Sequence, residues 1–112
     1  MHYWGAFYLS RILTSNLRCL VAEQGDLELG RIRIRRRGNL EVYGRGRFGG
    51  APVRVGFVLA GPETAPADAL SLFVESQRGE TKSTSRRLVP PGASERATGA
   101  LLRRLLARSP SG

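Results

Sequence analysis

The stretch from Arg31 to Leu59 constrains the fold of this chain more than any other. Apolar and polar residues alternate along it with a period of two, and glycine-containing turn sequences interrupt it twice. Such alternation is typical of antiparallel strands that bury one face and expose the other. It predicts a three-stranded antiparallel meander with strands over 27–36, 39–48 and 52–60.

The first turn sets the register of the first two strands. A three-residue loop over 37–39, with a glycine or asparagine at positive φ, places Ile34 opposite Val42. A two-residue loop would slip the register by one and turn the isoleucines toward the face of Glu41. The phase of the alternation changes at Gly30. A β-bulge there, with the glycine in the left-handed region, keeps the earlier leucines on the apolar face.

The second turn sets the register of the third strand. A four-residue loop over 49–52 is favoured over a tight turn because the proline at its end has no N–H for the ladder. This loop pairs Phe48 with Val53 and sets Arg47 opposite Arg54.

The registers divide the predicted sheet into two chemically different faces. The apolar face consists of Ile32, Ile34, Leu40, Val42, Phe48, Val53, Val55, Phe57 and Leu59. The other face carries arginines around one tyrosine, namely Arg31, Arg33, Arg35, Arg45, Arg47, Arg54 and Tyr43. The first face requires a helix to cover it, and the second requires water or an anion.

Two helices are expected on either side of the meander. Leucines at helical spacing predict an amphipathic helix over 6–22, although alternation at 17–22 also fits a strand. After the meander, Leu70, Phe73 and Val74 recur at helical spacing, and they predict a helix over 65–78 that lies on the apolar face.

The rest of the chain divides into a linker, a helix and a tail. Residues 79–94 are polar without periodicity and are expected to form a loop or linker. Ser94 can cap a last amphipathic helix over 95–108, and 109–112 form a disordered tail. The expected organisation is therefore an α+β domain over 1–78, followed by these three segments.

Charge carries the main functional hypothesis. The chain has 112 residues and a formal net charge of +9, and eight of its seventeen arginines lie between Arg31 and Arg54. Arg31 opposite Arg45 and Arg47 opposite Arg54 would repel each other, and a bound polyanion would relieve that repulsion. We therefore expect a small non-enzymatic protein that binds a polyanion, above all nucleic acid. GC-rich coding would also produce many arginines.

A protein–protein interaction module is the alternative function. Its contacts would come from an exposed sheet edge, from the N-terminal aromatic residues Trp4 and Tyr8, or from the C-terminal leucines Leu101 and Leu105.

Motifs for chemistry are sparse. The single cysteine, Cys19, is expected to be a small buried residue in a reducing, cytoplasmic protein, and the single histidine lies at the N-terminus. The pattern Gly44-x-Gly46-x-x-Gly49 lies inside a strand and its turn, not between a strand and a helix as in dinucleotide sites. We therefore expect no enzyme activity, metal or cofactor. No apolar run approaches the ~20 residues of a membrane span.

Overall fold

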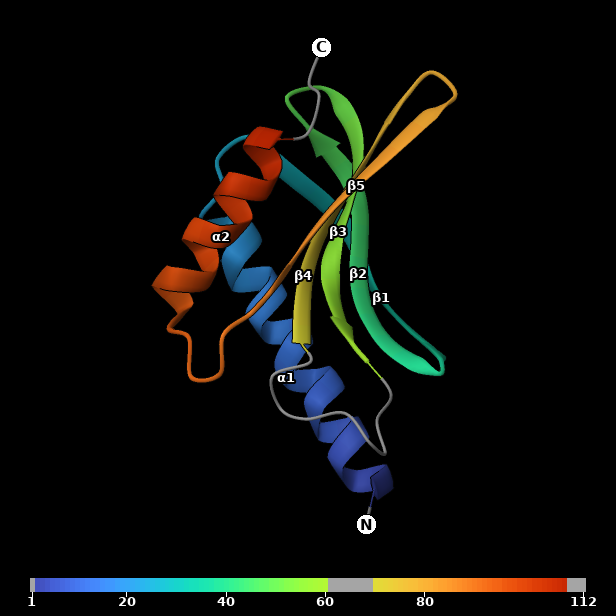
Figure 1. The fold of residues 1–112 in the computed structure, drawn as a ribbon, viewed down its shortest axis with the longest axis vertical. Coiled ribbons are helices and arrows are strands. Elements are labelled where there is room, and N and C mark those ends of the chain that lie inside the picture. The colour runs from blue at the N-terminus through green and yellow to red at the C-terminus, as the bar shows by residue number, and fades with distance from the viewer. Residues whose placement is uncertain (1, 61–69, 109–112) are drawn as a thin grey trace.

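Five antiparallel strands and two helices make up the part of the chain that this computed structural model describes (Figure 1). It describes residues 2–60 and 70–108, and side chains from residue 9 onward within these ranges. The elements are α1 (His2–Ala22), β1 (Leu27–Arg37), β2 (Asn39–Phe48), β3 (Ala51–Leu59), β4 (Leu70–Arg78), β5 (Thr81–Leu88) and α2 (Glu95–Arg108). The strands lie side by side in sequence order. The predicted α+β class is confirmed, but the prediction of three strands is wrong.

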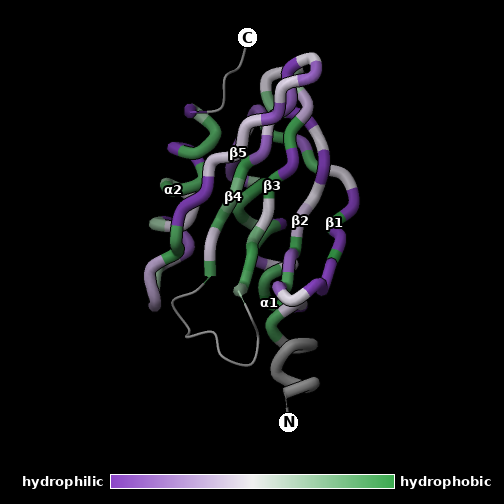
Figure 2. The backbone as a smooth tube through the Cα atoms, turned by 45° about the vertical axis from the view of Figure 1, so that its right-hand side comes forward, coloured by the Kyte–Doolittle hydropathy of each residue, from purple (hydrophilic) through white to green (hydrophobic). Residues whose placement is uncertain are grey.

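Both helices pack on one side of the sheet, which we call the inner face (Figure 1). The core is built from fully buried leucines and valines of both layers, namely Leu17, Leu20, Val42, Val55, Leu72, Val74, Leu102, Leu105 and Leu106. Hydropathy follows this arrangement, because β3 and β4 are largely hydrophobic while the edge strand β1 is largely hydrophilic (Figure 2). The predicted apolar face is buried or half-buried except at Ile34, which is 52% exposed near the β1–β2 turn.

Helix α1 confirms the predicted N-terminal helix. It begins at His2 rather than at residue 6 and continues to Ala22, so the alternative strand over 17–22 is wrong. Leu9, expected on its buried stripe, is 41% exposed. Just beyond the helix, Gln24 Nε2 donates a hydrogen bond to the Gly99 carbonyl at 3.4 Å and so links α1 to α2.

The β1–β2 hairpin has the predicted register. Ile34 pairs with Val42, and Gly38 alone separates the strands at φ 74°. The register shifts between Leu29 and Ile32, which confirms a bulge at the predicted place. Its glycine does not adopt a positive φ, however, so the left-handed conformation predicted there is wrong.

The β2–β3 turn is tighter than predicted. Gly49 and Gly50 form a two-residue loop with φ of 58° and 85°, the pattern of a type I′ turn, which matches the twist of the strands. Residues 51 and 52 therefore belong to β3. The pairing moves by two residues relative to the prediction, so the same residues face inward but Arg54 lies opposite Arg45, not Arg47.

Residues 70–78 form strand β4 and not the predicted helix over 65–78. Leu70, Leu72 and Val74 face inward with the core, while Phe73 and Glu75 face the opposite side. The helical spacing was misleading because this stretch also alternates with a period of two. The first part of the expected helix, residues 65–69, lies outside the described residues.

Strand β5 occupies half of the segment 79–94 that was expected to be a loop. Gly79, at φ 60°, opens a two-residue turn, after which residues 81–88 pair with β4. As an edge strand β5 is exposed along nearly its whole length, so its sequence has no apolar alternation to reveal it.

Helix α2 has the predicted bounds of 95–108. The Ala97 backbone N–H donates to Ser94 Oγ at 3.1 Å, which confirms Ser94 as the cap.

Candidate functional site

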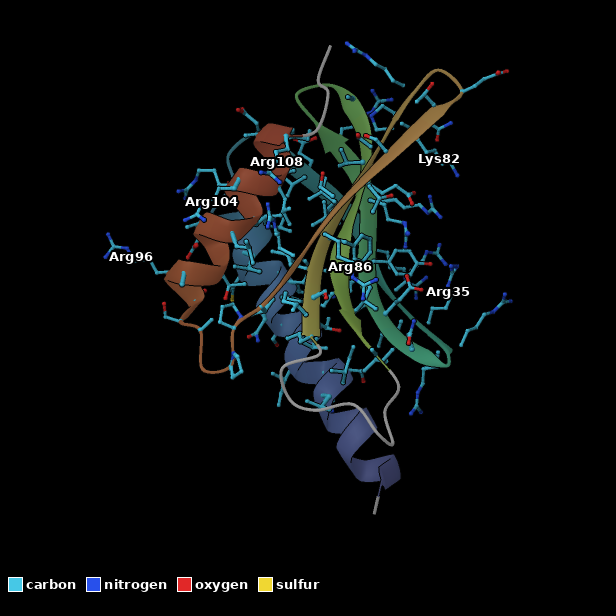
Figure 3. All side chains as sticks on the ribbon, in the orientation of Figure 1. Arg35, Lys82, Arg86, Arg96, Arg104 and Arg108 are labelled. Atoms are coloured by element: carbon cyan, nitrogen blue, oxygen red, sulfur yellow. The ribbon has the colours of Figure 1, made fainter. Side chains whose placement is uncertain are left out.

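The side of the sheet opposite the helices, which we call the outer face, is a basic surface that neither α1 nor α2 covers. Side chains alternate between the two faces of a strand, so every second residue of each strand contributes to it. Its basic residues are Arg33, Arg35, Arg37, Arg45, Arg47, Arg54, Lys82 and Arg86. Its acidic residues are Glu28, Glu41 and Glu75. Figure 3 shows Arg35 and Lys82 on this side, away from the arginines of α2.

Arg54 is the centre of the outer face. Its Nε and Nη2 donate to the two carboxylate oxygens of Glu75 at 3.3 and 3.2 Å, and its Nη1 donates to Glu41 Oε1 at 3.1 Å. Its guanidinium carbon lies 5.0 Å from the ring centroid of Tyr43 and 4.7 Å from that of Phe73. Only 16% of the Arg54 side chain is exposed. Arg54 is therefore a partly buried cation, and each of its three nitrogens donates a hydrogen bond to a carboxylate.

A glycine makes room for this centre. Gly56 lies between Tyr43 on β2 and Phe73 on β4. A Cβ at this position would collide with the Val42 carbonyl oxygen and would come within 2.6 Å of Tyr43 Cβ. The absence of a side chain therefore lets β2 approach β3 while Tyr43 packs over the gap.

Hydrogen bonds and charge attraction stabilise the ionised forms of Arg54 and Glu75. Burial opposes the charge of Arg54, but hydrogen bonds and charge attraction from Glu75 and Glu41 outweigh it and raise the Arg54 pKa. Hydrogen bonds from Arg54 are the main cause that lowers the pKa of Glu75; burial opposes this, and the charges of Arg54, Lys82 and Arg45 add to the lowering. Both shifts favour the charged forms of Arg54 and Glu75 at neutral pH.

Acid is expected to destabilise the fold through Glu75. Because its pKa is lower in the folded state than the ordinary 4.5, it stabilises the fold above that pH, and the contribution is lost as pH falls through the folded pKa. Urea unfolding of Glu75→Gln should therefore show a weaker loss of stability between pH 5 and pH 3 than the unaltered protein. Glu80→Gln, in the exposed β4–β5 turn, is the matched control and should keep the full acid dependence. Equal acid dependence in all three proteins would contradict this role of Glu75.

The cations around this centre are more exposed and less engaged. Arg35 Nε lies 3.7 Å from Glu41 Oε2 and its side chain is 45% exposed. Arg47 Nη1 donates to the Gly50 carbonyl at 3.1 Å, which leaves its charge without a carboxylate. No ion pair within the described residues involves Arg33, Arg45, Lys82 or Arg86. The outer face therefore has a neutralised centre and a positive periphery.

Most of the arginines expected on one face do share it. Arg33, Arg35, Arg45, Arg47, Arg54 and Tyr43 all belong to the outer face. Arg31 lies in the bulge of β1, so the predicted pairing of Arg31 with Arg45 is wrong.

The repulsion expected between arginines that face each other is offset within the protein. Arg45 does lie opposite Arg54, but Glu41 and Glu75 offset the Arg54 charge, so the repulsion at this pair is already relieved within the protein.

The sequence interpretation missed the contribution of the last two strands. Lys82 and Arg86 join the outer face from β5, and Phe73 and Glu75 join it from β4. The alternation of Lys82, Thr84 and Arg86 was the available signal, but the neighbouring residues are also polar, so no apolar face marked a strand.

The residues expected to contact a protein partner are placed differently. Leu105 is buried and Leu101 is partly buried against the core, so the leucines of α2 face their own domain. The side chains of Trp4 and Tyr8 lie outside the described residues. Cys19, expected to be buried, is exposed.

A cavity of about 350 Å³ lies between α1, the sheet and the segment before α2, with Leu13, Phe57 and Val89 among its apolar walls. Its polar lining residues are Asn16, Glu95 and Thr98.

In the described part of the chain no three His, Cys, Asp or Glu side chains group closely enough to hold a metal ion.

Comparisons with protein-family models, with curated proteins and with solved structures found no match to this chain. None of the helices described here has the length and apolar character needed to cross a membrane.

Proposed function

We propose that this chain is a small, non-enzymatic protein that binds nucleic acid through the outer face of its sheet. The observation that carries the proposal is a sheet face left open by both helices, on which eight basic side chains outnumber three acidic ones. Two of these three carboxylates are taken up by Arg54, which leaves the peripheral cations available for anionic ligands.

The chemistry of these cations suits phosphate. Arginine presents a planar fork of N–H donors that matches two phosphate oxygens, and it stays charged at every physiological pH. Because the cations project from paired strands, the backbone fixes their spacing before a ligand arrives, which lowers the ordering cost of binding. Contacts of this kind release condensed counterions from nucleic acid, so binding must weaken with salt.

A titration at several salt concentrations tests the proposal. We expect a fluorescently labelled, mixed-sequence DNA duplex to bind, with a plot of log K against log salt of slope about −4 to −5 if about five phosphates are contacted. Fluorescence anisotropy between 50 and 300 mM salt gives the slope. Absence of binding at the lowest salt would refute the proposal and leave the arginines as a consequence of coding composition.

A protein-interaction module is the second candidate, and exposed apolar residues on α1 favour it. Leu9 and Ile12 are 41% and 45% exposed on a helix whose other leucines are buried. The outer edges of β1 and β5 also have no neighbouring strand among the described residues.

A further inference from the structure

The two aromatic rings of the outer face are covered by arginines. Tyr43 and Phe73 are 7% and 3% exposed. The guanidinium of Arg54 lies over both rings, and those of Arg35 and Arg45 each lie 6.0 Å from the Tyr43 ring centroid. Neither ring therefore presents an open surface on which a base could stack.

Because these rings are buried, the outer face cannot use base stacking, which is one of two contributions that proteins use to bind single strands. Proteins that bind single-stranded nucleic acid without sequence preference combine a basic surface with exposed aromatic rings that stack on the bases. On the outer face the basic contribution remains and the stacking contribution is absent. Contacts to the phosphate backbone alone are left, and these carry no base sequence information.

The cations are also arranged in two groups with a neutral strip between them. One group, on β1 and β2, consists of Arg33, Arg35, Arg37, Arg45 and Arg47. The other, on β5, consists of Lys82 and Arg86. Between them β3 and β4 contribute Arg54 and Glu75, which neutralise each other.

The distance between the groups fits a duplex. Strands β2 and β5 are three strand spacings apart in the sheet, which is about 14 Å at about 4.8 Å per spacing. The major groove of a B-form duplex is about 12 Å wide and is bordered by one phosphate row on each side. A duplex can therefore offer phosphates to both groups at once, whereas an extended single strand offers one row.

We propose that the outer face recognises double-stranded nucleic acid by its paired phosphate rows, independently of base sequence, and disfavours single strands. This inference rests on the proposed function and specifies its ligand class. Even with about five contacts to each ligand, the slopes of about −0.9 per contact for a duplex and −0.7 for a single strand give a duplex preference of about tenfold at 0.1 M salt. A single strand that reaches only one group makes fewer contacts, so we expect a preference of about tenfold or more.

The test compares one labelled DNA duplex, a second duplex of scrambled sequence, and each constituent single strand, all at 0.1 M salt with the full chain. We expect the two duplexes to bind within about twofold of each other and at least about tenfold more tightly than the strands. Inorganic polyphosphate, which has one phosphate row, should compete less well than unlabelled duplex at equal phosphate concentration.

A pair of matched variants tests the two groups of cations. Lys82→Gln with Arg86→Gln removes the β5 group, and the ratio of duplex to single-strand affinity should fall to about fourfold, the preference that about three remaining contacts give from the two slopes. Arg103→Gln with Arg104→Gln removes the same charge from exposed positions on α2 and should leave the ratio unchanged.

Failure of the duplex preference can be distinguished from failure of nucleic-acid binding as such. Single strands that bind as tightly as the duplex, or duplexes that differ strongly with sequence, overturn the inference while leaving nucleic-acid binding in place. An unchanged ratio in the Lys82/Arg86 variant also overturns it. No binding by any of these nucleic acids overturns the proposed function and the inference together.

Discussion

Replacement of Gly56 by alanine should destabilise the fold by about 3 kcal/mol or more. The new methyl group would collide with the Val42 carbonyl oxygen and would lie within 2.7 Å of Tyr43 Cα. These are backbone atoms of the paired strand β2, so a side-chain rotation cannot relieve the contact. The strands would have to separate in the middle of the sheet, where ladder hydrogen bonds and the packing of Tyr43 would both be weakened.

Urea unfolding of Gly56→Ala measures this effect, and Gly25→Ala is its control. A methyl group on Gly25 would meet no other atom within 4 Å, and the φ of Gly25 is not positive. Alanine at this position should therefore change the free energy of unfolding by less than about 1 kcal/mol. A loss of less than about 1 kcal/mol in Gly56→Ala would show that β2 and β3 are not paired this closely at Tyr43.

Removal of three peripheral cations from the outer face should abolish most of the proposed binding. The variant carries Arg33→Gln, Arg45→Gln and Arg86→Gln, which lie on three different strands and have no ion pair within the described residues. At 0.1 M salt the loss of three phosphate contacts should reduce duplex affinity on the order of 10²- to 10³-fold and reduce the magnitude of the salt slope by about 3.

The control is a second triple variant that has the same net charge as the first. Arg96→Gln, Arg104→Gln and Arg108→Gln remove three exposed arginines from α2, on the other side of the molecule (Figure 3). That variant should lose much less affinity and keep nearly the full salt slope. Equal losses in the two triple variants would mean that net charge, rather than the outer face, determines binding. All six substitutions are at exposed positions, so thermal unfolding should show both variants folded.

The first hairpin was predictable because two independent patterns agreed there. Alternation fixed which residues of β1 and β2 face inward, and Gly38 fixed the length of the turn between them. At the second hairpin only the alternation was informative. It gave the right faces, but alternation is unchanged by a shift of two residues, so the tight Gly49-Gly50 turn and the pairing of Arg45 with Arg54 were missed.

The last two strands were missed for different physical reasons. In β4 the spacing of Leu70, Phe73 and Val74 fits a helix as well as a strand, and only its pairing with β3 decides between them. In β5 both faces are polar because the strand lies at the edge of the sheet, so its structure depends on hydrogen bonds to β4 rather than on burial.

These errors also concealed the centre of the candidate site. Arg54 was correctly placed on the basic face, yet its role depends on Glu75, which was assigned to a helix. Once β4 pairs with β3, Glu75 lies directly opposite Arg54 and Phe73 opposite Gly56. Without the pairing of β4 with β3, Arg54 was interpreted as an anion-binding residue. With that pairing, its carboxylate partner Glu75 makes it a structural one.

The most direct test of binding at the outer face is a two-dimensional amide NMR titration of the protein with an unlabelled DNA duplex. We expect the largest shift changes at the amides of outer-face residues on β1, β2 and β5, including Arg33, Arg45 and Arg86, and small changes along α2. Changes confined to α2, or to the exposed segment of α1 around Ile12, would contradict the proposed site and would direct attention to the interaction-module alternative.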